Sequence, residues 1–69
     1  MDFKVGDTVG IKEPNLYTGV GVIKEEDVGV VGGYTDDFPT LVYVDFTNKG
    51  NFMNPKGRVV LYARDLERR

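Results

Sequence analysis

The sequence contains no cysteine, histidine, serine, tryptophan or glutamine. Without cysteine, the protein can form no disulfide, thiolate nucleophile or cysteine-ligated zinc site. Without histidine, it lacks the commonest general base and transition-metal ligand, and without serine it lacks a hydroxyl nucleophile of that type. Carboxylates, lysines, tyrosines and threonines remain, and they support acid–base catalysis only where burial shifts their pKa values. The polar sequence gives no sign of such burial.

The length of 69 residues predicts a single domain that covers residues 1–69. A domain of this size buries only ~60% of the surface of its unfolded chain, so its core must be compact. Pockets for drug-sized ligands measure roughly 300 Å³ or more, and a small core leaves little room for one. We therefore expect a non-enzymatic protein with no catalytic residue, metal site, cofactor or small-molecule substrate.

The chain also lacks long apolar runs. Its N-terminus has no charged segment followed by an apolar one, as a signal peptide would have. The longest apolar-rich run, Val28 to Val31, is far shorter than the ~20 residues of a membrane span. We expect a soluble, cytoplasmic protein that does not bind membranes.

The residues that are present favour strands. Eleven valines stand against one alanine, and nine glycines and three prolines interrupt the chain. Branched side chains such as valine fit a pleated sheet and resist helices. The predicted strands are Asp7–Glu13, a strand from Gly19 that Gly21 bends or bulges, a continuation or short strand at Val28–Val31, Thr40–Phe46 and Arg58–Ala63.

Thr40–Phe46 is the clearest strand, because its side chains alternate in character. Asp45 is the least buriable of them, so Val42, Val44 and Phe46 on the opposite face are expected in the core.

Turn signals separate these strands. Residues 32–39 and 47–57 are rich in turn residues, and Asn54-Pro55-Lys56-Gly57 has the residue order of a type I turn. Residues 64–66 predict a short helical turn with Leu66 in the core. Short strands spaced about every ten residues are typical of a small sandwich or barrel. We predict an all-β fold, a five-stranded small barrel with a 3₁₀ turn near the C-terminus.

The order of these segments resembles the SH3-like small barrels, including KOW and Tudor-like domains. The resemblance covers Phe3–Val9, Gly19–Ile23, the strand ending at Phe46 and Val59–Leu66. It implies the five-stranded SH3-like barrel and a role in docking onto a larger assembly.

The chain is also similar to the small stromal-side accessory subunit of photosystem I. That subunit carries a basic residue where this chain has Tyr43. The positions that carry the similarity are Gly6, Val9, Ile11, Pro14, Tyr17, Pro39, Val42, Val44 and Phe46.

Charge is divided unevenly along the chain. Residues 1–46 hold three lysines and nine acids, whereas residues 47–69 hold six basic residues and two acids. The six basic residues could form one patch that attracts an acidic partner or a phosphate backbone, or they could be a solvated surface. The acidic pI of about 4.9 disfavours nucleic acid. The candidate patch is Lys49, Lys56, Arg58, Arg64, Arg68 and Arg69.

Several aromatic side chains fall outside the predicted core. Tyr17, Tyr34, Phe38 and Phe52 lie in predicted loops, and Tyr43 lies on the outer face of its strand. Amphipathic aromatic residues are favoured at interfaces. Packing as caps of the barrel ends is favoured for the two phenylalanines, and packing and partner contact are equally plausible for the tyrosines. The candidate partner-binding residues are Tyr17, Tyr34, Tyr43 and Phe52.

The acidic runs Glu25–Asp27 and Asp36–Asp37 lack the alternating spacing of a calcium loop and predict solvated turns. The sequence thus favours a binding module that docks onto a protein partner as an accessory or regulatory factor. Two alternatives remain open. One is a KOW-like transcription or translation element that contacts RNA or DNA through the C-terminal basic residues. The other is a noncatalytic subunit of an oxidoreductase or photosynthetic complex.

Overall fold

The computed structural model describes residues 3–35 and 40–69, and within them the regular elements are strands and two 3₁₀ turns. The predicted all-β fold is confirmed. Within the described residues, no helix is long and apolar enough to cross a membrane. In chain order the elements are β1 (Thr8–Ile11), β2 (Asn15–Thr18), β3 (Gly21–Lys24), β4 (Gly29–Tyr34), β5 (Leu41–Asp45), η1 (Thr47–Lys49), β6 (Arg58–Tyr62), η2 (Ala63–Asp65) and β7 (Leu66–Arg68).

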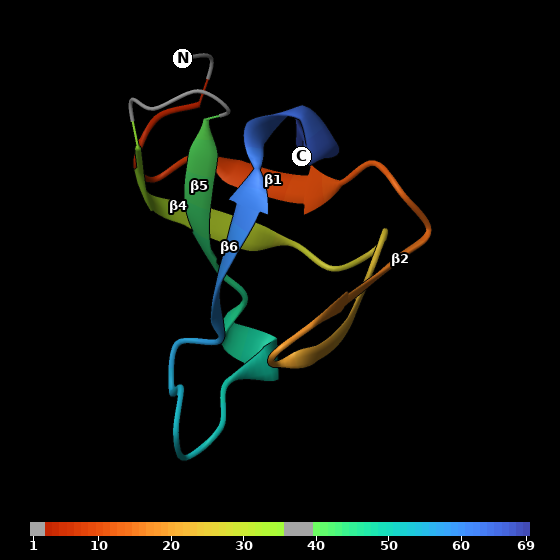
Figure 1. Ribbon diagram of the computed structural model, residues 1–69, viewed down its shortest axis with the longest axis vertical. Coiled ribbons are helices and arrows are strands. Elements are labelled where there is room, and N and C mark those ends of the chain that lie inside the picture. The colour runs from red at the N-terminus through yellow and green to blue at the C-terminus, as the bar shows by residue number, and fades with distance from the viewer. Residues whose placement is uncertain (1–2, 36–39) are drawn as a thin grey trace.

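Five of the strands form one antiparallel sheet with the order β6-β5-β4-β1-β7 (Figure 1). The other two, β2 and β3, form a separate antiparallel hairpin. In the part of the chain that the structure describes, the strands therefore form two sheets and no closed five-stranded barrel. The hairpin leaves the main sheet between β1 and β4 and stands beside it, so β6 and β7 remain sheet edges.

Three local predictions need correction. No strand was predicted between Glu13 and Gly19, whereas Asn15–Thr18 forms strand β2. Gly21 was expected to bend or bulge a strand, but its φ of 107° places it at the end of the hairpin turn. The bulge lies instead in β4, where the register with β5 shifts between Val31 and Gly33. β4 also continues to Tyr34, inside the predicted loop, whose residues 36–39 lie outside the described residues.

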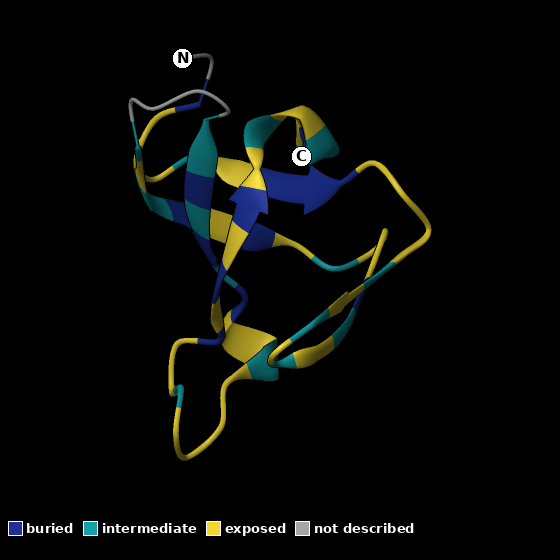
Figure 2. Cartoon of the chain, in the orientation of Figure 1, coloured by how far each residue is buried: buried dark blue, intermediate teal, exposed yellow. Residues whose placement is uncertain are grey.

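Most of the core residues come from the strands of the five-stranded sheet, where the buried positions are dark blue in Figure 2. The alternation predicted for β5 is confirmed, because Val42, Val44 and Phe46 are fully buried while Asp45 is only half-buried. β6 alternates in the same way. The buried apolar residues are Phe3, Val9, Ile11, Ile23, Val31, Val42, Val44, Phe46, Val59, Leu61 and Leu66.

The C-terminal predictions are also confirmed. The backbone N–H of Gly57 donates to the carbonyl of Asn54 at 3.0 Å, which closes the predicted turn before β6. The 3₁₀ turn η2 follows β6 directly and brings Leu66 into the core, where it is 2% exposed. One turn thus precedes β6 and another follows it. Strand β6 forms the sheet edge beside which the candidate site lies.

Candidate binding groove

An open groove of about 540 Å³ lies between the β2–β3 hairpin and the edge strand β6. This corrects the expectation that so small a chain leaves no room for a sizeable pocket. The space exists because the hairpin stands apart from the main sheet and does not pair with β6. The groove is lined by residues 16–20 of the hairpin, by Asn51, Met53 and Asn54, by residues 58–62 of β6, and by Asp65.

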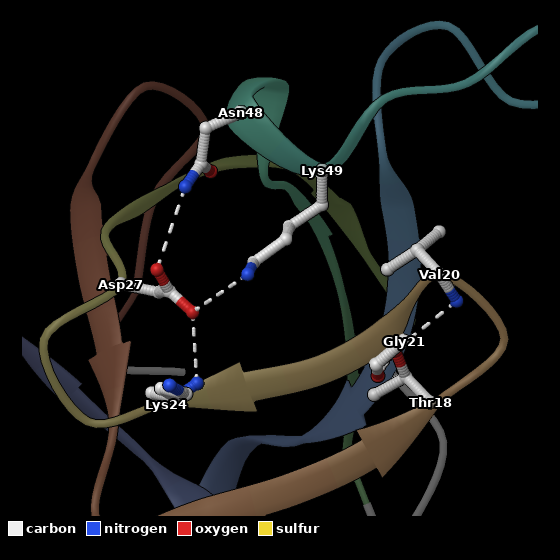
Figure 3. Close-up of polar contacts among 7 residues, drawn as sticks. All are labelled: Thr18, Val20, Gly21, Lys24, Asp27, Asn48 and Lys49. Carbon is white, nitrogen blue, oxygen red and sulfur yellow. Dashed lines mark hydrogen bonds and ion pairs between the residues drawn. The ribbon is translucent and has the colours of Figure 1, made fainter.

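The tip of the hairpin is shaped by a two-residue turn between Thr18 and Gly21 (Figure 3). The Thr18 hydroxyl donates to the carbonyl of Gly21 at 2.9 Å and accepts the backbone N–H of Val20 at 3.2 Å. Glycine suits the last position because a φ of 107° is rarely adopted by residues with a Cβ. These contacts hold Tyr17 and Val20 along the groove.

The base of the hairpin is tied to η1 by Asp27 (Figure 3). Its carboxylate accepts the backbone N–H of Lys24 at 2.8 Å and the Asn48 amide at 3.4 Å, and it lies 3.5 Å from the Lys49 ammonium. The backbone hydrogen bond from Lys24 is the main cause that lowers the pKa of Asp27, helped by Asn48 and Lys49. The predicted solvated turn therefore contains one half-buried acid that fixes the hairpin.

Strand β6 forms the opposite wall. Its register with β5, together with the flanking bonds from Phe46 to Gly57 and from Ala63 to Thr40, turns the backbone of Val59 and Leu61 toward β5. The backbone N–H groups of Val60 and Tyr62 consequently point away from the sheet. Their side chains are 49% and 40% exposed.

The side chain of Asn54 covers the Arg58 end of this edge. The backbone N–H of Arg58 donates to Asn54 Oδ1 at 3.0 Å, and the Asn54 amide donates to the Arg58 carbonyl at 2.8 Å. The amide of Asn54 thus pairs with Arg58 as a neighbouring strand residue would. The unpaired backbone of β6 begins only beyond Arg58.

The segment before Asn54 presents apolar side chains to solvent. Asn51 Oδ1 accepts the backbone N–H groups of Met53 and Asn54 at 2.9 and 2.8 Å, which fixes the loop. Met53 is 88% exposed and Phe52 is 95% exposed. The expectation that Phe52 caps the core is wrong, because its loop extends away from the sheet (Figure 2). Phe38 lies outside the described residues.

Two charged groups mark the ends of the groove. Arg58 donates to both carboxylate oxygens of Asp45 at 2.6 and 3.0 Å, and this pairing lowers the pKa of Asp45 and raises that of Arg58. The bulge residue Gly32 makes room for the pair, because a Cβ there would collide with the guanidinium. At the Tyr62 end, the half-buried Asp65 has no ion pair within residues 3–35 and 40–69.

The structure separates the four candidate aromatic residues. Tyr17 lines the groove and is 82% exposed, and Phe52 neighbours the lining residue Met53. Tyr43 is paired across the sheet with Val60, so it flanks the groove on the outer face of the sheet. Tyr34 pairs with the buried Val42 on β5 and does not line the groove.

The basic residues are spread over several contacts. Lys49 pairs with Asp27, Arg58 with Asp45, and Arg68 with Asp7, so cations of the C-terminal third meet acids of the first two thirds. The remaining three have other surroundings: Lys56 contributes to the lowered pKa of Asp45, Arg64 lies 4.6 Å from the centre of the Tyr62 ring, and Arg69 pairs with Glu67 and donates to the carbonyls of Ile11 and Glu25. The fold thus mixes charges that the sequence keeps apart.

Sequence reasoning missed most of the groove. Val60 carried a usable signal, because an apolar residue between the inward-facing Val59 and Leu61 must face outward. The adjacent apolar pair Phe52-Met53 inside a polar loop was a second signal. Asp65 and Asn54 carried none, since their roles depend on which segments meet. Among the described residues, no three carboxylates gather closely enough to hold a metal ion.

Comparisons with known proteins add no family to this description. No protein-family model matches the chain, and no match was found among curated proteins or among solved structures.

Proposed function

We propose that this protein is a non-enzymatic binding module that docks onto a protein partner through the groove beside β6, as an accessory or regulatory factor of a larger complex. The observation that carries the proposal is the gathering of exposed apolar side chains around one concave surface. Tyr17, Met53, Val60 and Tyr62 are each at least 40% exposed, and all line the groove. Exposed apolar surface concentrated in this way is typical of interaction sites.

We also propose that the chain belongs to the SH3-like small barrels, in an open form in which β6 and β7 are sheet edges. Support comes from the five strands of the main sheet and from the 3₁₀ turn that separates the last two strands. In such barrels the long loops flank the usual binding surface, and here the loop 47–57 borders the groove. A cytoplasmic location remains part of the same proposal.

The pairing of basic residues with acids favours a protein partner over nucleic acid. Lys49, Arg58, Arg68 and Arg69 each pair with an acid, and the pI is about 4.9. Nucleic-acid binding depends on cations that can replace the counterions of several phosphates. A noncatalytic subunit of an oxidoreductase or photosynthetic complex would be one form of the proposed accessory role.

Affinity capture from a lysate of the source cells, with and without nuclease, tests this function. The bait is the whole chain, alongside the double variant Tyr17→Ala/Met53→Ala, whose two side chains are more than 80% exposed. The control is Val5→Ala, which removes an exposed apolar side chain outside the groove. We expect to capture a protein partner whether or not nuclease is added. The captured amount should fall about tenfold with the double variant and stay unchanged with the control. Recovery only without nuclease, or no recovery, would contradict the proposal.

A further inference from the structure

The edge of β6 carries backbone groups without partners where it lines the groove. Within the described residues, the N–H groups of Val60 and Tyr62 and the carbonyl of Val60 have no hydrogen-bond partner, since β6 pairs only with β5. The equivalent groups of Arg58 are occupied by Asn54. An unpaired strand edge is a template to which another extended chain can add.

This edge is recessed, and the recess limits what can reach it. The hairpin tip stands on one side of β6 and the 51–54 segment borders the same groove. A folded partner would have to bring its own edge strand past the hairpin. A single extended chain needs only the ~4.8 Å spacing of neighbouring strands, so it enters more easily.

The chemistry of the lining indicates which chain would fit. Val60 and Tyr62 project from the same face of β6, and Leu16 and Val20, which pack against the core, line the groove from the hairpin. Because side chains alternate along a strand, a paired peptide would place apolar residues at every second position. At the Tyr62 end, the carboxylate of Asp65 has no ion pair among the described residues, whereas Arg58 at the other end is paired with Asp45. The unneutralised charge in the groove is therefore negative.

We propose that the groove binds an extended peptide segment that adds as a strand to β6 at Val60 and Tyr62, carries apolar residues at alternate positions and places a lysine or arginine beside Asp65. This inference rests on the proposed function, because it specifies the partner of the same groove.

The test begins with a displayed library of short linear peptides selected on the whole wild-type chain. We expect selected sequences with alternating apolar residues and a basic residue at one end. Amide hydrogen exchange on the complex with the best synthetic peptide gives the decisive measurement. The amides of Val60 and Tyr62 should exchange rapidly in the free protein and at least tenfold more slowly in the complex. Those of Val59 and Leu61, already paired with β5, serve as internal controls.

Backbone methylation of the peptide tests strand addition without altering the protein. One N-methyl group placed at the residue opposite Val60 should weaken binding about tenfold, because it removes one backbone hydrogen bond. Methylation of the adjacent residues should be tolerated, since their N–H groups point away from β6. Equal sensitivity at every position, or no added protection at Val60 and Tyr62, would overturn strand addition.

The variant Asp65→Asn tests the charge preference. It should select peptides that keep the apolar alternation and lose the basic residue. It should also bind the peptide selected on the wild-type protein a few-fold more weakly at low salt. Glu26→Gln, an exposed acid outside the groove, is the matched control and should select as the wild type does. If the Asp65→Asn variant still selected peptides with the basic residue, the proposed pairing of that residue with Asp65 would be contradicted.

The two proposals fail separately. If lysate capture recovers a protein partner through the groove while no linear peptide is selected, the groove binds a folded surface, and only the strand-addition inference is wrong. If neither experiment yields a partner, the proposed function itself is wrong.

Discussion

The five-stranded sheet buries the apolar side chains of its inner face, whereas the segments across the groove expose several of theirs. In the sheet, Phe46 is fully buried, as are its neighbours on the inner face of β5. In the 51–54 segment, Phe52 is 95% exposed, and in the hairpin Tyr17 is 82% exposed. The hairpin inserts Ile23 into the core, but its tip and base are fixed by polar contacts of Thr18 and Asp27. The difference teaches that apolar burial stabilises the sheet and anchors the hairpin, whereas hydrogen bonds fix the tip and base of the hairpin and leave exposed apolar side chains such as Tyr17 available for binding.

The largest effect that would sharpen this comparison is expected from the two phenylalanines. Phe46→Ala should lower the free energy of unfolding by about 3–5 kcal/mol, because it opens a cavity in the core. Phe52→Ala should change it by less than about 0.5 kcal/mol, because the side chain is almost fully solvated. Urea denaturation of both variants measures the contrast, and similar losses would show that the loop also stabilises the fold.

An intermediate effect is expected at the hairpin turn. Gly21→Ala should cost about 1–3 kcal/mol, since the φ of 107° is strained for any residue with a Cβ although no atom obstructs the space. Gly19→Ala is the matched control, with open space and no such φ, and should be nearly neutral. The measurement is again urea denaturation. Equal stability of the two variants would mean that turn geometry does not hold the wall.

The smallest effect concerns acid pH. The pKa values of Asp27 and Asp45 are lowered from 3.8 in the fold, by the Lys24 backbone and by Arg58 respectively. The unfolded chain therefore binds more protons as pH falls below about 4, and the stability from both acids, present at higher pH, is lost there. Asp27→Asn and Asp45→Asn should each cost roughly 1 kcal/mol at neutral pH and make the melting temperature less dependent on pH.

Melting curves recorded from neutral to strongly acidic pH measure this effect. Glu26→Gln, at an exposed position, should follow the wild-type curve. If Asp27→Asn retains the full acid dependence while Asp45→Asn loses it, the polar tie at the hairpin base contributes nothing and only the sheet is stabilised by charge.

The structural features that depend on residues close together in the sequence were predicted correctly. The alternation of Thr40–Phe46, the turn at Asn54–Gly57 and the 3₁₀ turn before Leu66 are local patterns, and the structure contains each of them. The β2 strand was missed because Pro14 and Asn15 are typical turn residues. The strand is held by its pairing with β3.

The candidate site was harder to predict because it depends on segments distant in the chain. Asp7 and Arg68 are separated by 61 positions, yet they pair and cancel charge that the sequence seemed to gather at one end. The groove likewise joins the hairpin to β6. Composition and periodicity carry no record of which segments meet, so Tyr17 was identified as a candidate while Met53, Val60 and Asp65 were not.

The side-chain amide of Asn54 has a consequence for how the molecule behaves when it is concentrated. Exposed strand edges invite neighbouring molecules to stack into continuous sheets, which is a route to aggregation. By occupying the backbone of Arg58, Asn54 shortens the open edge to its last few groups. Two copies meeting along β6 would therefore form fewer backbone hydrogen bonds than a fully open strand would allow. A single asparagine thereby makes this edge a weaker template for stacking of the protein on itself.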